Sequence, residues 1–110
     1  MMADIGDVIE LTVDIHERGL RAGFQGTIVH IHNDNAYEVE FTDEAGETLD
    51  LLALHSEQFI IIWRSETQQW VPVAEQAATL IANLPNEAAQ EVLDFARFLT
   101  VRNQKNGGQK

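Results

Sequence analysis

The chain of 110 residues contains no cysteine, which excludes a disulfide framework and a thiolate metal site. Long apolar runs are also missing, since the longest, residues 59–63, is far too short to span a bilayer. The first twenty residues are acidic and show no signal-peptide pattern, so we expect none. We therefore expect a soluble cytoplasmic protein without membrane contact, built as one compact domain or as a small domain with an appendage.

Positive charge is scarce and unevenly spread. Seven Lys and Arg stand against eighteen Asp and Glu, which gives a formal net charge of −11 at pH 7. Residues 1–65 carry −10 of this charge, and residues 66–110 carry only −1. An acidic surface repels phosphates and attracts basic proteins, so we expect a basic protein partner and no direct nucleic-acid contact. The alternative is that the charge serves solubility alone.

Short alternating segments between turn residues predict five β-strands. They are residues 7–12, 26–32, 36–42, 48–54 and 58–63. Gly19, Gly23 and Gly26 are predicted turn residues that lead the chain into the second strand. Such a start is typical of a small, strongly bent SH3-like β-barrel, here residues 1–65, an architecture that serves binding more often than catalysis.

Alternation also assigns faces within the second predicted strand. Thr27, Val29 and Ile31 are expected on one face. The other face is then expected to carry Ile28, His30 and His32.

The fourth and fifth predicted strands are apolar on both faces. Their apolar residues are Leu49, Leu51, Leu52, Leu54, Ile60, Ile61 and Ile62. A strand of this kind is normally covered on both faces, and it promotes aggregation when it is left bare. We therefore expect another part of the molecule to pack on the outside of the barrel.

Residues 66–105 are expected to form a helical hairpin, which makes the fold class α+β. Pro72 suits the start of a first helix, and apolar residues follow it at helical spacing. Pro85 interrupts this helix, and Asn86 and Glu87 suit the start of a second one. Residues 106–110 are expected to be a disordered tail.

The apolar side chains of the hairpin cover more helical surface than one contact uses. We predict that some of them form an interface with a protein partner or with a second copy, as a hetero-complex or a homodimer. The alternative is that the hairpin only caps its own barrel. The predicted interface residues are Leu80, Ile81, Leu84, Val92, Phe95, Phe98 and Leu99.

Two histidines and two serines were weighed as chemical groups. His30 and His32 share a face, and a turn at residues 33–35 places Glu38 opposite His30. Two imidazoles and a carboxylate can hold zinc or copper, but an exposed polar strand face gives the same pattern, so we predict a solvated His–Glu pair and no metal. Ser56 and Ser65 lack a glycine elbow and a suitably placed histidine. We therefore expect a non-enzymatic protein without a cofactor.

Residues 4–63 resemble a bacterial, notably cyanobacterial, family of small proteins known only as a domain of unknown function. Its pattern D-x-V-x-L-T-x-D corresponds to residues 7–14, and G-L-x-x-G-x-x-G-T-V-V corresponds to residues 19–29. The patterns A-Y-E-V-E-F-x-D and G-x-T-x-x-L-x-x-L correspond to residues 36–43 and 46–54. The resemblance implies an SH3-like barrel, and members are often encoded beside small partners in arrangements that look like toxin–antitoxin pairs.

The C-terminal part is similar to the tail of small antitoxin-like proteins. Their hinge I/L-x-x-L-P-x-E corresponds to residues 81–87, and E-V-L-D-F-x-x-F-L corresponds to residues 91–99. This resemblance implies a partner-binding or oligomerising tail. The combined hypothesis is an antitoxin-like or inhibitory subunit that neutralises a basic protein. The competing hypotheses are a structural or accessory subunit of a larger enzyme complex and an RNA-binding barrel, for which the loop before Gly26 offers only Arg18 and Arg21.

Overall fold

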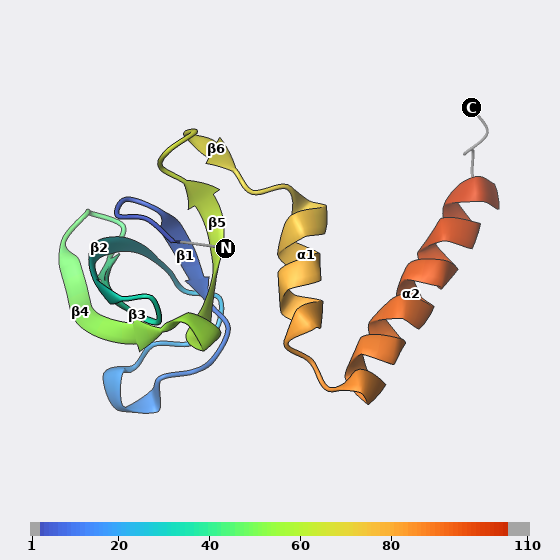
Figure 1. The fold of residues 1–110 in the computed structure, drawn as a ribbon, viewed down its shortest axis with the longest axis horizontal. Helices are drawn as coiled ribbons and strands as arrows, with labels where there is room; N and C mark the ends of the chain where they lie inside the picture. Colours follow the sequence, from blue (N-terminus) through green and yellow to red (C-terminus); the bar gives the residue numbers. More distant parts are fainter. Residues whose placement is uncertain (1–2, 106–110) are drawn as a thin grey trace. The chain divides into compact units, whose positions relative to one another are not determined.

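The computed structural model describes residues 3–105, and the chain forms two compact units, residues 1–76 and 77–110. Each unit is described by itself. The expected α+β class is confirmed, since strands fill the first unit and two helices follow them (Figure 1). The predicted tail, residues 106–110, lies outside the described residues.

The first unit is built around one antiparallel sheet of six strands in the order β4-β3-β2-β1-β5-β6. The strands are β1 (Val8–Leu11), β2 (Gln25–Asn33), β3 (Ala36–Thr42), β4 (Thr48–His55), β5 (Phe59–Arg64) and β6 (Gln69–Trp70). Short 3-10 turns, η1 (His16–Arg18) and η2 (Ser56–Gln58), precede β2 and β5. The structure differs from the predicted five-stranded barrel in two respects. A sixth strand extends the sheet, and the sheet is open, with β4 and β6 as its edges.

Strand β2 lies between β1 and β3 and so joins the β1-β5-β6 part of the sheet to the β3-β4 part. Thr27 pairs with Val8 of β1 on one side and with Glu40 of β3 on the other. Beside it, Gly26 is buried, and a Cβ atom there would lie 2.7 Å from Val39 Cγ1 and 2.9 Å from the Phe41 ring. Glycine is therefore needed at position 26 because β3 side chains occupy the space of a Cβ atom.

The other two predicted turn glycines have the expected backbone. Gly19 and Gly23 have φ angles of 68° and 97°, in the left-handed region that glycine adopts freely. The loop that they shape also contributes to the core, because Ile15 and Leu20 form an isolated bridge and are both buried. Gly26, in contrast, lies inside β2 and is not a turn residue.

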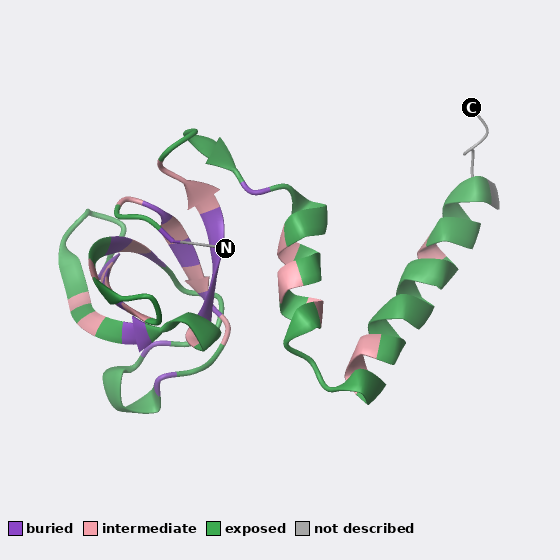
Figure 2. Cartoon of the chain, in the orientation of Figure 1, coloured by how far each residue is buried: buried purple, intermediate pink, exposed green. Residues whose placement is uncertain are grey.

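Most of the buried side chains of the first unit form one hydrophobic core, which draws on every strand except the two-residue β6 (Figure 2). Its members are Ala3, Ile9, Leu11, Ile15, Leu20, Ile28, Tyr37, Val39, Phe41, Leu54, Phe59, Ile61 and Val71. The Tyr37 and Phe59 rings meet edge to face at 5.7 Å between centroids, a favourable arrangement for aromatic pairs.

The expected faces of β2 are wrong for part of the strand. The pairing with β3 shifts register between Ile28 and His30, so Val29 is the extra residue of a β-bulge. Ile28 therefore points into the core, whereas His30 lies opposite Glu38 on the side of the sheet that points away from the core. Beyond the bulge, Ile31 is partly buried against the core, opposite Tyr37.

The expected cover on both faces is found on β5 and not on β4. Ile60 and Ile62 are buried, although they alternate with the core residue Ile61. On β4, by contrast, Leu49 and Leu51 are exposed by 57% and 50%. The side of β4 that points away from the core is therefore an open apolar surface.

One buried carboxylate joins the segment before β1 to the residue that follows β5. Asp7 is 1% exposed, and its Oδ1 accepts hydrogen bonds from the Ser65 amide at 2.8 Å and the Ser65 hydroxyl at 3.1 Å. Its Oδ2 accepts a third bond, from the Asp4 amide at 2.9 Å. A buried carboxylate is tolerated when it is fully hydrogen-bonded, and Asp7 meets this condition.

The helices are α1 (Val73–Ala82) and α2 (Asn86–Lys105), and no residue of α1 is buried. The carbonyl of Pro72 accepts bonds from the amides of Glu75 and Gln76, and the carbonyl of Pro85 accepts one from the amide of Ala89. Each proline therefore marks a helix start, as expected. Within residues 3–105, neither helix combines the length and apolar character that crossing a membrane requires.

Replacing Gly26 by alanine is expected to destabilise the first unit by about 1–3 kcal/mol, because the new methyl group overpacks against Val39 and Phe41. Urea unfolding measures the change. Val39→Ala removes the closest clashing group, so Gly26→Ala and Val39→Ala together should cost about 1 kcal/mol less than the sum of their separate effects. Strict additivity would contradict the proposed contact.

Replacing Asp7 by alanine is expected to cost about 3 kcal/mol, because the amides of Asp4 and Ser65 lose their acceptor inside the protein. Ser65→Ala is the matched control, since it removes the hydroxyl and leaves both amide bonds in place. We expect it to cost about 1 kcal/mol. Thermal unfolding of the two variants decides the point, and equal losses would contradict a dominant role of the carboxylate.

Candidate protein-interaction surfaces

Two carboxylates lie side by side on the outer face of β3. Glu38 pairs with His30 of β2 and with Ala53 of β4, and Glu40 pairs with Thr27 and Leu51 in the same way. Because alternate residues of a strand share a face, both carboxylates point away from the core, which takes Tyr37, Val39 and Phe41.

The exposed leucines of β4 lie beside these carboxylates. Leu51 is the cross-strand partner of Glu40, and Leu49 is the extra residue at a bulge one step further along. We define the outer face as Glu38, Glu40, Leu49 and Leu51. It combines the negative charge of β3 with the apolar area of β4, an edge strand of a type that pairs readily with other chains.

Sequence reasoning did not predict the outer face as a site. Leu49 and Leu51 were expected to be covered, and Glu38 was considered only as a partner of His30. The available signal was the alternation of Glu38 and Glu40 opposite a strand with apolar residues on both faces.

The two histidines lie next to the outer face. The predicted register is confirmed, since His30 faces Glu38. The close contact, however, is made by His32, whose Nε2 lies 2.8 Å from Glu38 Oε1, while the His30 and His32 rings meet edge to face at 4.9 Å. Among residues 3–105, no group of three or more His, Asp and Glu side chains is arranged to hold a metal ion.

Both candidate serines make structural hydrogen bonds. The Ser65 hydroxyl donates to the Ile5 carbonyl at 3.0 Å and to the buried Asp7 carboxylate. The Ser56 hydroxyl donates to Asn35 Oδ1. Each hydroxyl therefore stabilises a segment beside the sheet through its hydrogen bonds.

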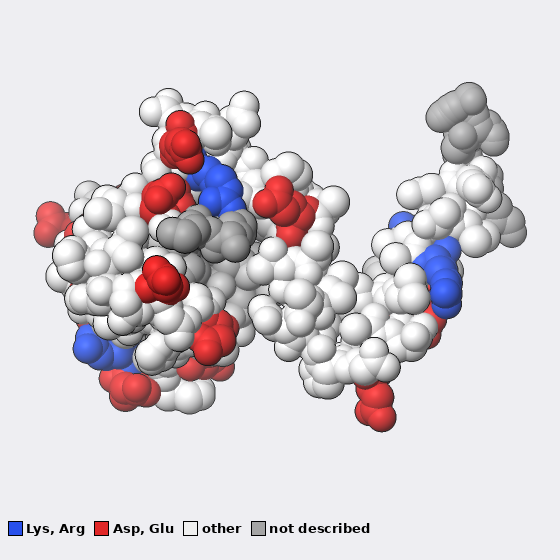
Figure 3. All heavy atoms as spheres, in the orientation of Figure 1, with Lys and Arg blue, Asp and Glu red and all other residues white. Residues whose placement is uncertain are grey.

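Acidic groups dominate the surface of the first unit (Figure 3). Residues 1–76 contain fifteen acidic and three basic side chains, whereas residues 77–110 contain three acidic and four basic ones. Of the three arginines, Arg18 is already paired with Asp50 of β4. The first unit thus concentrates the negative charge of the chain.

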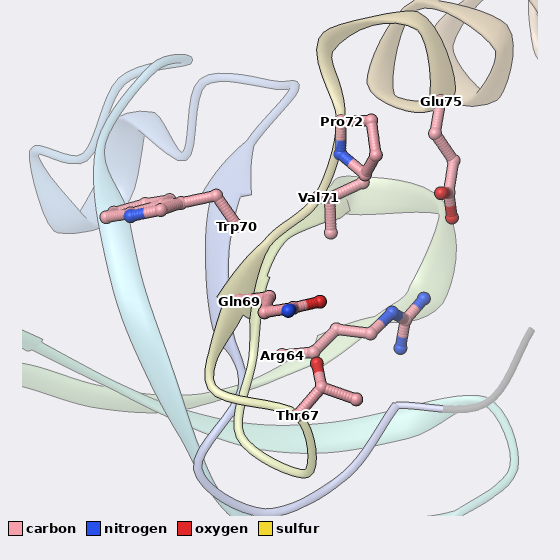
Figure 4. A pocket seen from close by; sticks show the side chains of 7 residues that line it. All are labelled: Arg64, Thr67, Gln69, Trp70, Val71, Pro72 and Glu75. Carbon is pink, nitrogen blue, oxygen red and sulfur yellow. The ribbon is translucent and has the colours of Figure 1, made fainter.

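A shallow hollow of about 230 Å³ lies around β6 and is lined by residues of one continuous stretch, Arg64, Thr67, Gln69, Trp70, Val71, Pro72 and Glu75. Figure 4 shows the Trp70 ring directed away from the Arg64 guanidinium. Trp70 is 67% exposed, so most of its ring faces solvent and does not line a closed cavity. The hollow has the form of a surface depression, without the enclosure typical of a small-molecule site.

The sequence profile described as "Domain of unknown function (DUF4926)" matches residues 5–61. This is more than half of the chain. The chain belongs to the DUF4926 family. No curated protein and no solved structure matches it.

The matched DUF4926 segment contains β1 to β4 and the first half of β5, and with them the whole outer face. The suspected resemblance to a domain of unknown function is therefore confirmed. Both helices lie beyond the matched residues.

The predicted interface residues lie on these two helices and are mostly open. Leu80, Leu84, Val92, Phe95 and Phe98 are exposed, and Ile81 and Leu99 are partly buried. Leu93 and Val101 of α2 are also exposed, although the sequence did not single them out. Their use as an interface stays a prediction.

Removing both histidines is expected to change the stability of the first unit by about 1 kcal/mol or less, because His30 and His32 form only exposed contacts. Urea unfolding of the His30→Ala, His32→Ala double variant measures the effect. Elemental analysis of the dialysed protein is the second readout. Stoichiometric zinc in the wild type that disappears in the double variant would contradict the absence of a metal site.

Proposed function

We propose that the chain is a non-enzymatic, acidic protein-binding module that acts as an antitoxin-like or inhibitory subunit and neutralises a basic protein partner. The observation that carries the proposal is the outer face. There, Glu38 and Glu40 lie beside the exposed Leu51 and Leu49 on the edge strand of a strongly acidic unit.

The two components of the outer face have different roles in binding. The negative charge of the half-buried Glu38 and Glu40 attracts a basic protein over a distance and raises the rate of encounter. The leucines then provide apolar area that water leaves when the partner docks, at about 25 cal/mol per Å² before the costs of association. An edge strand also offers backbone groups to an extended segment of a partner.

An SH3-like fold of the first unit forms part of the proposal. The strand order β4-β3-β2-β1-β5, with the short helical turn η2 before the last strand, supports it. On this view β6 is an addition that extends the sheet beyond β5. We place the protein in the cytoplasm, where a chain without cysteine needs no oxidising environment.

Charge argues against RNA as the direct ligand. The first unit has fifteen acidic and three basic side chains, so it repels a phosphate backbone. One of the three basic side chains, Arg18, is already paired with Asp50. The accessory-subunit hypothesis predicts binding to a partner without inhibition, and this difference can be measured.

The test is affinity capture from native cells with the full chain, followed by binding kinetics with the purified partner. We expect a basic protein whose on-rate falls roughly tenfold between low and high salt, because counterions screen the steering charges. Glu38→Gln with Glu40→Gln should slow association markedly. Glu10→Gln with Glu66→Gln removes the same charge outside the outer face and serves as the matched control.

Inhibition is tested in the same system. Expression of the captured partner alone should impair growth or show an activity, and co-expression of the wild-type chain should suppress it. A partner that binds with an on-rate independent of salt, or that is affected equally by both pairs of substitutions, would contradict the outer face as the docking site. A partner that is bound but never inhibited would support the accessory role instead.

A further inference from the structure

Charged residues and phenylalanines are arranged along α2 so that the helix, read backwards, has the same pattern with the opposite charges. Glu91, Phe95, Phe98 and Arg102 follow one another at spacings of four, three and four residues. Read from either end, the pattern is a charged residue, two phenylalanines and a charged residue, with the sign of the charge reversed. A sequence of this kind can match a second copy of itself that runs in the opposite direction.

These four residues share one stripe of the helix. At 3.6 residues per turn, their directions fall within a sector of about 60° around the axis. The Phe95 and Phe98 rings stack at 6.0 Å between centroids, and the Arg102 guanidinium lies 5.6 Å from the centre of the Phe98 ring. We name this set the α2 stripe.

The α2 stripe is open in the structure. Phe95 and Phe98 are exposed by 60% and 55%, and Glu91 and Arg102 are exposed as well. Large apolar rings in a row on an exposed helix face are typical of an interaction surface.

The charged ends of the stripe have no oppositely charged neighbour within reach along their own helix. Glu91 has Glu87 and Asp94 one turn away, and Arg102 has only apolar residues, asparagine or lysine at the corresponding positions. The two are eleven residues apart, a rise of about 16 Å, so they do not pair with each other. By contrast Asp94 and Arg97, which lie off the stripe, pair at 3.3 Å.

We infer that the α2 stripe binds the α2 stripe of a second copy of this chain, with the helices antiparallel around a twofold axis between Ala96 and Arg97. In this register Phe95 faces the second copy's Phe98, and Glu91 faces the second copy's Arg102. The twofold symmetry repeats both contacts, so two ring pairs are flanked by two ion pairs.

Charge selects this arrangement over the parallel one. The acidic residues Glu87, Glu91 and Asp94 precede the basic residues Arg97 and Arg102 along α2. Parallel helices would place like charges opposite each other, whereas antiparallel helices place opposite charges together and oppose the helix dipoles favourably. Dimerisation through α2 goes beyond the proposed function and does not depend on it, because the outer face lies on the sheet.

Sedimentation of the full chain across a concentration series tests the proposal. We expect a dimer for the wild type and a dissociation constant at least about tenfold higher for Glu91→Arg and for Arg102→Glu, since each puts two pairs of like charges into the interface. An equimolar mixture of these two variants should recover dimers with nearly the wild-type affinity, because one ion pair is rebuilt with reversed sign and the other keeps its original residues. Arg97→Glu makes the same charge change about 200° around the helix from Phe95 and should leave dimerisation nearly unchanged.

Crosslinking provides a second readout that does not depend on charge reversal. Since the chain has no cysteine, Glu91→Cys and Arg102→Cys introduce single thiols. Oxidation of the mixture should link the two different variants, and each variant alone should stay largely unlinked. Circular dichroism of each variant verifies that α2 is still helical.

A wild type that sediments as a monomer at about 100 μM would overturn the inference. Efficient crosslinking of either thiol variant with itself would also overturn it, because this result indicates parallel helices. Loss of dimerisation with Arg97→Glu equal to that with Arg102→Glu would overturn the role of the stripe. None of these results touches capture of a basic partner through Glu38 and Glu40, so the two proposals fail separately.

Discussion

The close approach of β2 to β3 at Gly26 is the constraint on which the first unit depends. The Val39 and Phe41 side chains occupy the space beside the Gly26 backbone, and one residue later Thr27 pairs with strands on both sides. This allows a single strand to belong to both halves of the sheet. The core residues of β1, β3 and β5 then meet on one side of the sheet, and the polar and exposed residues of β3 and β4 are left on the other.

The functional surfaces follow from this division. Once Tyr37, Val39 and Phe41 are committed to the core, the intervening Glu38 and Glu40 have only the outer face available. The adjacent β4 is an edge strand, so its leucines meet solvent and the acidic strand lies next to apolar area. The charge of the first unit and the apolar stripe of α2 thus belong to separate parts of the chain, and the proposed partner and the proposed second copy do not compete for one surface.

Much of the fold was predictable from the sequence because strands such as β3 alternate regularly and are bounded by turn residues. The span of β3 was predicted without error, since alternation and turn residues mark both of its ends. The sixth strand was missed because Gln69 and Trp70 are too few to show a period. The faces of β2 were partly wrong because a bulge inserts one residue and shifts the alternation, and no turn residue marks it. Leu49 and Leu51 were expected to be covered, since composition gives the polarity of a strand but not its position at the edge of a sheet.

The bond between Asp7 and Ser65 bears on where the domain ends. The family match stops at residue 61, yet Asp7, inside the match, depends on Ser65, which lies outside it. Val71, ten residues past the match, is also part of the core, and its amide donates to the carbonyl of Ile62. A fragment cut at the limit of the match would contain every matched residue and still lack part of its own interior. The folding unit of this chain is therefore longer than the segment by which the family is recognised.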